Sequence, residues 1–98
     1  MQKFDRKLWN DGIINKDNIR EYDLRGADLS DLDLSNIDFS FLNLENVNFS
    51  NSDLENSIFS HASFINADFT DADLYKTIFW PVKNTYDAVC TEESKLKK

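Results

Sequence analysis

Leucine or phenylalanine occupies every fifth position of this chain from residue 24 to residue 79, twelve times in succession. A spacing of five fits neither the turn of an α-helix, about 3.6 residues, nor the two-residue alternation of a β-strand. Strict repetition at a short, fixed spacing is typical of a solenoid, in which each coil covers the core of the next. We call these twelve residues the centres and expect them to form the core: Leu24, Leu29, Leu34, Phe39, Leu44, Phe49, Leu54, Phe59, Phe64, Phe69, Leu74 and Phe79.

The residues around each centre follow a second pattern. The position two before the centre is mostly small or apolar, as in Ala27, Val47 and Ala67, and the position directly before it is mostly Asp or Asn. The two positions after the centre are largely Ser, Asn, Asp or Glu. Each unit of five therefore reads in, out, in, out, out, which predicts a short extended stretch followed by a polar corner.

The units ADLSD, LDLSN, SDLEN, ADFTD and ADLYK resemble those of the pentapeptide-repeat family, whose pattern is a small residue, Asp or Asn, Leu or Phe, and two polar residues. The resemblance runs without interruption over residues 22–81, and Asp17-Asn18-Ile19 stays in frame as a degenerate thirteenth unit. It implies an all-β solenoid, a right-handed quadrilateral β-helix with four repeats per coil. The twelve repeats would then form about three coils, in a body ~14 Å tall.

The ends of such a body would expose core residues, so we expect a capping segment at each end. In residues 1–16, the apolar residues Phe4, Leu8 and Trp9 have helical spacing and precede Gly12. This pattern predicts a short N-terminal cap helix.

The β-helix itself is expected over residues 17–81. The chain after Pro81 loses the five-residue pattern and ends in lysines, which suit the C-terminal end of a helix. We therefore expect residues 82–98 to form a C-terminal helix. That helix would cap the last coil, dock a second subunit, or do both.

The charge of the chain is acidic and unevenly distributed. The formal net charge is −7, and residues 22–81 alone hold eleven acids against two bases, which gives −9. An acidic body repels nucleic acid and anionic membranes, so we expect a protein partner with a basic surface, and no direct nucleic-acid or membrane binding. The chain has no apolar run of membrane-spanning length, no secretory signal core, and a single cysteine, Cys90. These features lead us to expect a cytoplasmic protein.

The sequence offers no recognisable catalytic or metal-binding motif. His61 is the only histidine, and no nucleophile or set of metal ligands converges on it by spacing. Cys90 lies near acidic residues, which disfavour a reactive thiolate. The Asp residues should point outward from a convex surface, whereas metal and glycosidase sites need carboxylates that face one another. We therefore expect a non-catalytic protein without a metal or other cofactor.

The first candidate site is an acidic column of Asp33, Asp53 and Asp73, one coil apart on one face, with Glu55 beside them. Asp also suits this position because its side chain can bond to the backbone of a turn, which explains the residue type without a binding role. Nine net negative charges over ~14 Å give about one charge per 1.6 Å, close to the ~1.7 Å of duplex DNA. Some pentapeptide-repeat proteins are thought to bind DNA gyrase as DNA-like bodies, so the resemblance also implies mimicry of DNA.

The second candidate site is an apolar patch on the face whose centres are phenylalanines. Ile58 and Ile78 replace the usual Asp or Asn there, and Phe41 and Trp80 occupy outward positions with His61 between them. Clustered exposed apolar residues usually mark an interface. Two alternatives stay open: the patch binds a partner or a second copy of the chain, or a terminal helix folds back and covers it.

Together these features predict a protein that acts by binding. Our first hypothesis is an acidic, DNA-mimicking inhibitor or modulator of a DNA-handling protein, of the kind that a phage or mobile element would direct against a host enzyme. The acidic column would engage a basic groove, and the apolar patch would pair subunits into a homodimer or anchor the partner. The alternative is a general scaffold or assembly module that uses the apolar patch, with the charge serving only solubility.

Overall fold

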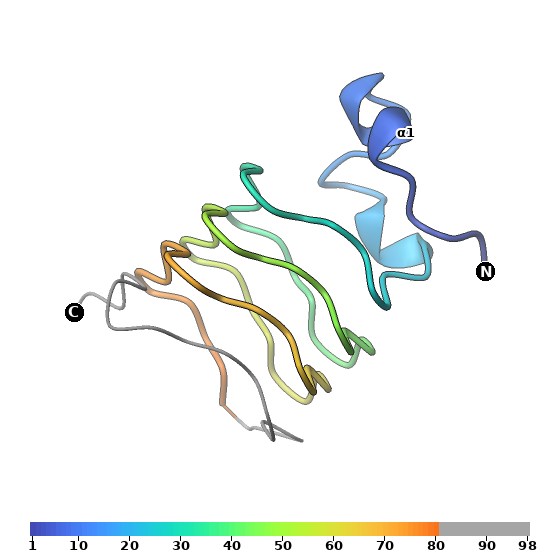
Figure 1. Cartoon of the computed structure of the whole chain (residues 1–98). Coiled ribbons are helices and arrows are strands. Elements are labelled where there is room, and N and C mark those ends of the chain that lie inside the picture. The colour runs from blue at the N-terminus through green and yellow to red at the C-terminus, as the bar shows by residue number, and fades with distance from the viewer. Residues whose placement is uncertain (81–98) are drawn as a thin grey trace.

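The computed structural model describes residues 1–80, so the helix expected in residues 82–98 lies outside the described part of the chain. Two short helical elements stand at the N-terminal end: the α-helix α1, Arg6–Asn10, and the 3-10 helix η1, Ile19–Glu21. After η1 the chain winds through turns that stack one behind another (Figure 1). No helix within the described residues is both long and apolar enough to cross a bilayer.

Residues twenty positions apart lie side by side in neighbouring coils. Eight parallel β-bridges each join two such residues, as Asp33 joins Asp53 and Asp53 joins Asp73. Two backbone hydrogen bonds support the second of these bridges: the N–H of Leu54 donates to the Asp73 carbonyl, and the N–H of Asp73 donates to the Ser52 carbonyl, both with N···O distances of 2.9 Å. Bonds of this kind hold each coil against the next.

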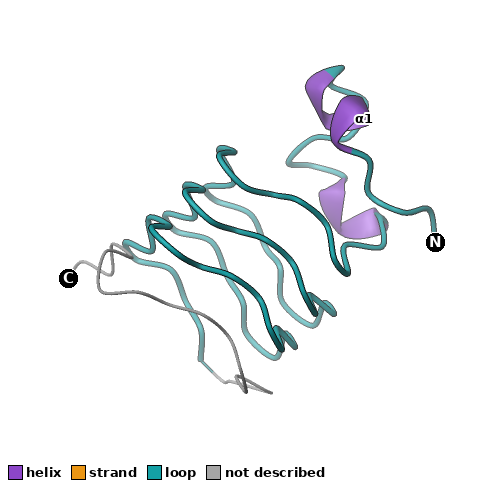
Figure 2. Ribbon diagram, in the orientation of Figure 1, coloured by secondary structure: helices purple, strands orange, loops and turns teal. Residues whose placement is uncertain are grey.

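Each bridge is isolated, so residues 1–80 contain no β-strand or β-sheet. Figure 2 shows the described residues outside the helices as loop. The sheets expected from the sequence are therefore not formed as such. The reason is geometric: a corner follows every centre, so each unit of five contributes one bridged residue before the chain turns. A strand would need consecutive extended residues to continue the pairing.

The corner is made by the second residue after each centre. From residue 26 to residue 76 this residue has a φ between 58° and 68° in every unit. Gly, Asn and Asp enter this left-handed region more readily than other residues, and they fill eight of the eleven corners. The three exceptions are Phe41, His61 and Lys76.

The centres form the core, as expected. Eleven of the twelve are at most 4% exposed, and Phe79 is half-buried. Phenylalanines one coil apart stack face to face: the ring centroids of Phe39 and Phe59 are 5.0 Å apart, and those of Phe59 and Phe79 are 5.2 Å apart. Rings on opposite sides of the coils, such as Phe59 and Phe69, meet edge to face at 5.8 Å. Both geometries are favourable for aromatic pairs.

The core also continues into the N-terminal segment. Four residues extend the five-residue spacing of the centres backward from Leu24: Phe4, Trp9, Ile14 and Ile19. Three of them are buried, and Trp9 is half-buried against the core. Lys3 forms a parallel bridge with Asp23, and the N–H of Phe4 donates to the Asp23 carbonyl at 2.9 Å. The first residues therefore stack against the first coil in register.

Helix α1 stands inside this segment and is shorter than the helix expected from Phe4, Leu8 and Trp9. It begins after Asp5, whose carboxylate accepts the N–H of Lys7 at 2.8 Å. A capping carboxylate of this kind satisfies a donor that the helix start leaves free. Phe4 precedes the helix because it pairs with the first coil, and its ring lies 6.4 Å from that of Trp9.

Candidate interaction surfaces

The Asp or Asn before each centre hydrogen-bonds to its own corner. In nine units the side-chain oxygen accepts the N–H of the residue two positions later, with N···O distances of 2.8–3.1 Å. These acceptors are Asp23, Asp28, Asp33, Asp38, Asn43, Asn48, Asp53, Asp68 and Asp73. The local role considered for Asp from the sequence is thus present, and it accounts for the residue type along the acidic column.

The structure stacks the acidic column as the five-residue spacing predicts. Asp33, Asp53 and Asp73 follow one another through parallel bridges. The carboxylate oxygens of Asp53, Glu55 and Asp73 come within 4.8 Å of one another. No ion pair with a cation is formed by these three residues within the described part of the chain. Asp33 differs, because its carboxylate binds the Lys16 ammonium at 3.0 Å.

The ion pair at Asp33 is one of four that link the N-terminal segment to the first coil. Each of the four sides of that coil has one cation from residues 3–20 on its aspartate. The pairs are Lys3–Asp23 at 4.0 Å, Arg6–Asp28 at 3.2 Å, Lys16–Asp33 at 3.0 Å and Arg20–Asp38 at 3.8 Å. The charge of −9 counted for residues 22–81 therefore overstates the negative charge near the first coil, because these cations lie outside the counted range.

Hydrogen bonds keep the first-coil aspartates ionised. The side-chain and backbone hydrogen bonds from Ser35, followed by the bond from Lys16, lower the pKa of Asp33 to about 2. A hydrogen bond from the Ser30 hydroxyl likewise lowers the pKa of Asp28, and one from the Ser40 hydroxyl lowers the pKa of Asp38. Donors to a carboxylate favour its charged form.

The residues of the apolar patch lie on one side of the coils and at the corner that follows it. Ile58 and Ile78 form a parallel bridge, and Ile78 is 48% exposed. Trp80 is 78% exposed, and its carbonyl accepts the Ser60 hydroxyl at 2.7 Å. Backbone pairing between coils thus connects the residues of the apolar patch, and their large side chains are exposed to solvent.

Phe41 and His61 complete the apolar patch at two successive corners. Their rings stack nearly parallel, with centroids 4.7 Å apart and an angle of 15° between the planes. Phe41 is 73% exposed, and His61 is exposed as well. Both take the left-handed conformation, with φ values of 66° and 61°. At the matching corners of the other sides, Asn, Asp or Gly stands in nearly every case.

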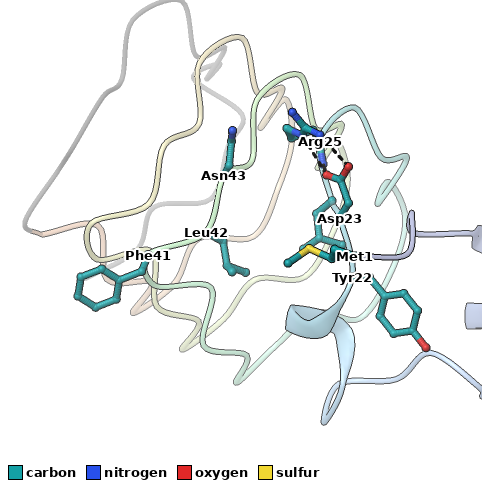
Figure 3. Close-up of a pocket in the computed structure, with 8 residues that line it drawn as sticks. Met1, Tyr22, Asp23, Arg25, Phe41, Leu42 and Asn43 are labelled. Carbon is teal, nitrogen blue, oxygen red and sulfur yellow. Dashed lines mark hydrogen bonds and ion pairs between the residues drawn. The ribbon is translucent and has the colours of Figure 1, made fainter.

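A pocket of about 450 Å³ opens between the first and second coils, beside Phe41. Its lining is Met1, Tyr22, Asp23, Leu24, Arg25, Phe41, Leu42 and Asn43. The guanidinium of Arg25 donates two hydrogen bonds of 3.0 Å to the Asp23 carboxylate on one side of the pocket (Figure 3). The two charged side chains of the lining are therefore bound to each other.

Reasoning from the sequence missed this pocket and the four ion pairs. Tyr22 and Leu42 were read only as inward residues of the repeat, and their unusual size was the available signal. Lys3, Arg6 and Lys16 lie in residues 1–16, which were expected to form a cap without a register, and Arg20 follows the degenerate unit that ends at Ile19. The register was readable, since Phe4, Trp9, Ile14 and Ile19 continue the spacing of the centres.

Comparison with known families agrees with the resemblance seen in the repeat units. Residues 43–80 match the family model of pentapeptide repeats, in eight copies. A search among curated proteins found no match. The matched segment holds the second and third coils, with the upper part of the acidic column and most of the apolar patch. Residues 43–80 are therefore repeats of the pentapeptide-repeat family.

Proposed function

We propose that this protein is a right-handed quadrilateral β-helix that binds another protein through the apolar patch and has no catalytic activity. Pentapeptide repeats are generally protein-interaction modules. The single observation that carries the proposal is the stacked pair of Phe41 and His61, exposed at two corners where the fold favours Asn or Asp.

The fold itself gives no reason for an aromatic residue at these corners. The left-handed conformation costs an ordinary L-residue roughly 1–2 kcal/mol, and Asn or Asp bears this cost more easily. Burial does not offset the cost, because Phe41 is 73% exposed. The stacking of Phe41 on His61 recovers about 0.5–1.5 kcal/mol for the pair. Contact with a partner supplies the missing reason, since strained backbone positions cluster where proteins bind ligands.

The neighbouring side chains suit the centre of a protein interface. Trp80 and Ile78 are exposed on the same side of the coils, and Ile58 lies between Ile78 and the first coil. Tryptophan and other aromatic residues contribute most strongly to binding when a partner excludes water from them. The backbone beneath is held by hydrogen bonds between coils, so the apolar patch is presented on a rigid support.

The acidic cluster of Asp53, Glu55 and Asp73 indicates what charge the partner's surface should carry. It lies on the side of the coils adjacent to the apolar patch, and the corner residues Asn56 and Lys76 stand between them. A partner that covers the apolar patch therefore meets negative charge at its edge. The matching surface has an apolar centre and a basic rim, a combination that gives both affinity and orientation.

DNA mimicry is the second candidate function, and the acidic cluster is the observation that favours it. Three carboxylates within 4.8 Å resemble the closely spaced charges of a phosphate backbone. The ion pairs of the first coil weaken this candidate. Four cations lie on the aspartates of that coil, so its negative charge is locally matched. Among the described residues, the closely spaced unpaired carboxylates are then confined to Asp53, Glu55 and Asp73, a shorter acidic surface than the groove of a DNA-binding protein covers on duplex DNA.

The test uses the full chain as bait in extracts of its own host, compared with two variants. Phe41→Asn with His61→Asn removes the stacked rings and installs the residue that the corner favours. Asp53→Asn with Asp73→Asn removes charge and keeps the hydrogen bonds to the corner. We expect a partner that the first variant loses and the second retains in part. Loss with the second variant alone would favour mimicry, and retention by both variants would overturn the proposal.

Purified partner then separates the two functions. Binding through the apolar patch should change little between low and high salt, whereas a DNA mimic should lose affinity steeply and be displaced by duplex DNA. Light scattering of the free protein tests whether a second copy of the chain binds the apolar patch. A doubled mass that Phe41→Asn with His61→Asn returns to the single mass would show that the apolar patch pairs two copies of the chain.

A further inference from the structure

The pocket of about 450 Å³ lies where the hydrogen bonding between the first two coils is interrupted. On the next side of the coils, the N–H of Leu29 donates to the Asn48 carbonyl at 2.8 Å, and the N–H of Asn48 donates to the Ala27 carbonyl at 3.0 Å. The equivalent bonds at the pocket would join Leu24 to Asn43 and Asn43 to Tyr22. Neither bond is formed, and Asp23 and Asn43 are not bridged.

Four main-chain groups are consequently left open across the pocket. They are the N–H of Leu24, the carbonyl of Tyr22, and the N–H and the carbonyl of Asn43, and none has a hydrogen-bond partner within residues 1–80. The bonds resume immediately beyond the pocket, where the N–H of Gly26 donates to the Glu45 carbonyl at 2.8 Å. The interruption is therefore confined to one side of one coil.

The side chains two positions before the centres explain the interruption. Tyr22 and Leu42 occupy this position in the first and second coils, so two large residues are stacked there. On each of the other sides a large residue at this position is followed by a small one, as Leu32 is by Ser52. Tyr22 and Leu42 both pack against the core. Their combined bulk gives a steric reason why the two coils do not pair at this point.

We propose that this gap binds an extended peptide segment of a partner protein, which hydrogen-bonds to the open main-chain groups. An extended segment presents N–H and C=O groups on both of its edges, and it can pair with an unoccupied sheet edge in this way. Leu24 and Tyr22 offer a donor and an acceptor on one side of the gap, and Asn43 offers both on the other side. The volume lies within the range of ordinary ligand pockets.

The lining also defines the chemistry of the segment. Met1, Leu42 and Tyr22 offer apolar contact in the pocket. The Asp23 carboxylate is already bound by Arg25, and the Lys3 ammonium donates to the Arg25 carbonyl. Since these charges are matched among themselves, the gap favours an uncharged segment with apolar side chains.

This proposal goes beyond the function of the apolar patch and does not rest on it. Phe41 belongs both to the apolar patch and to the lining of the gap, whereas Ile58, Ile78 and Trp80 lie outside that lining and separate the two proposals. A protein whose Trp80→Ser variant binds nothing through the apolar patch would still bind the segment in the gap. The two proposals therefore fail separately.

The first experiment measures amide hydrogen exchange by NMR in the free full chain. The amides of Leu24 and Asn43 should exchange fast, while those of Leu29 and Asn48, which make the equivalent bonds on the next side, should be protected. The protected pair also shows that the chain is folded. Equal protection of all four amides would mean that the gap is closed in solution and would overturn the proposal.

The second experiment adds a blocked pentapeptide with the sequence threonine, valine, leucine, valine, threonine. Exchange at Leu24 and Asn43 should slow by about tenfold at nine-tenths occupancy. The same peptide with N-methylated valines, which lacks those donors, should give no protection. Absence of protection by the unmodified peptide at millimolar concentration, or equal protection by both peptides, would contradict the proposal.

Two variants complete the design. Tyr22→Ala removes one of the two large residues, so the missing bonds should form and peptide binding should be lost. Leu32→Ala is the matched control, because Leu32 has the same position in its unit and also packs against the core, away from the gap. Peptide binding that survives in Tyr22→Ala, or that is lost equally in the control, would count against the gap as the site. Protection that rises with protein concentration alone would identify a second copy as the occupant and refute a partner segment.

Discussion

The residue before each centre serves the fold first and the surface second. Its oxygen accepts the N–H two residues later whether it belongs to an aspartate such as Asp53 or to an asparagine such as Asn48. The amide and the carboxylate do the same local work, because only one acceptor oxygen is needed. The choice of Asp over Asn is thus free to set surface charge, and a change from one to the other separates the two roles.

Asp33→Asn should therefore keep the corner and remove the ion pair with Lys16. The pKa of Asp33 is lowered to about 2 from the ordinary value of 3.8, so its stabilising contribution is complete above pH 3.8 and is lost as the pH falls toward 2. Because the pair is exposed, we expect a loss of about 1 kcal/mol or less. Urea unfolding between pH 2 and pH 7 measures it. The variant should unfold more easily at pH 7 and show a shallower decline with acid, and an unchanged pH profile would contradict this account.

The corner residues Phe41 and His61 give the second prediction at this scale. Phe41→Asn with His61→Asn should raise the free energy of unfolding by about 1 kcal/mol, since two strained residues are relieved and one stacked pair is lost. Thermal unfolding followed by circular dichroism measures the change. Asn46→Phe is the reverse control, because it places an aromatic residue at a corner whose neighbour one coil on is Asn66. It should destabilise the fold by roughly 1–2 kcal/mol, and a stable Asn46→Phe would show that these corners carry no strain.

At the scale of elements, the repeat units were predictable and the segment before them was only partly so. The centres, the outward Asp and Asn, and the stacking of Asp33 on Asp53 follow from a spacing of five, because identical units must repeat identical contacts. The N-terminal residues largely break the polar half of the pattern, so Ile14 keeps the spacing without the surrounding signature and Ile19 keeps it in the degenerate unit Asp17-Asn18-Ile19. The spacing proved sufficient for burial, since neither residue has any exposed surface.

The candidate sites show the same division. The members of the acidic column and of the apolar patch could be grouped from register alone. The ion pair of Lys16 with Asp33 could not, because it depends on how a non-repeating segment folds back on the first coil. The gap could not be predicted from the sequence either. It depends on Tyr22 and Leu42 being stacked in neighbouring coils, and each residue alone is compatible with the repeat.

The N-terminal segment offers a matched pair of residues for a test. Ile14 is completely buried, and its neighbour Ile13 is 56% exposed. Ile14→Ala should lower the free energy of unfolding by about 2–5 kcal/mol, because it removes buried methyl groups and leaves a cavity. Ile13→Ala should change it by about 0.5 kcal/mol or less. Chemical denaturation of both variants gives the comparison, and equal effects would mean that residues 1–20 do not complete the core.

For the molecule as a whole, the first coil differs from the later coils both in aromatic content and in the pairing of its acidic residues. The first coil has one phenylalanine among its four centres, the second has two and the third has three. The first coil also has each of its four aspartates paired with a cation, while Asp53, Glu55 and Asp73 have no such pair among the described residues. The end whose core is richer in phenylalanine rings is therefore also the end that presents the acidic cluster and most of the apolar patch. A rigid support lowers the entropy cost of binding at that end.

The stacked phenylalanines provide a test of how this support is distributed. Phe59 is fully buried between Phe39 and Phe79 and meets Phe49 and Phe69 edge to face, whereas Phe79 is half-buried. Phe59→Ala should cost about 3–5 kcal/mol, the range for a buried ring, and should lower stability on both of its neighbouring coils. Phe79→Ala should cost less, because its ring loses fewer contacts. Urea unfolding gives the two free energies. Hydrogen exchange shows how far each loss spreads, because the Leu34 amide bonds the first coil to the second and the Leu54 amide bonds the second coil to the third. If Phe79→Ala proved as destabilising as Phe59→Ala, the last coil would contribute as much to stability as the buried middle of the core. The apolar patch beside Phe79 would then serve to cover the end of the core, and it would not be a surface available to a partner.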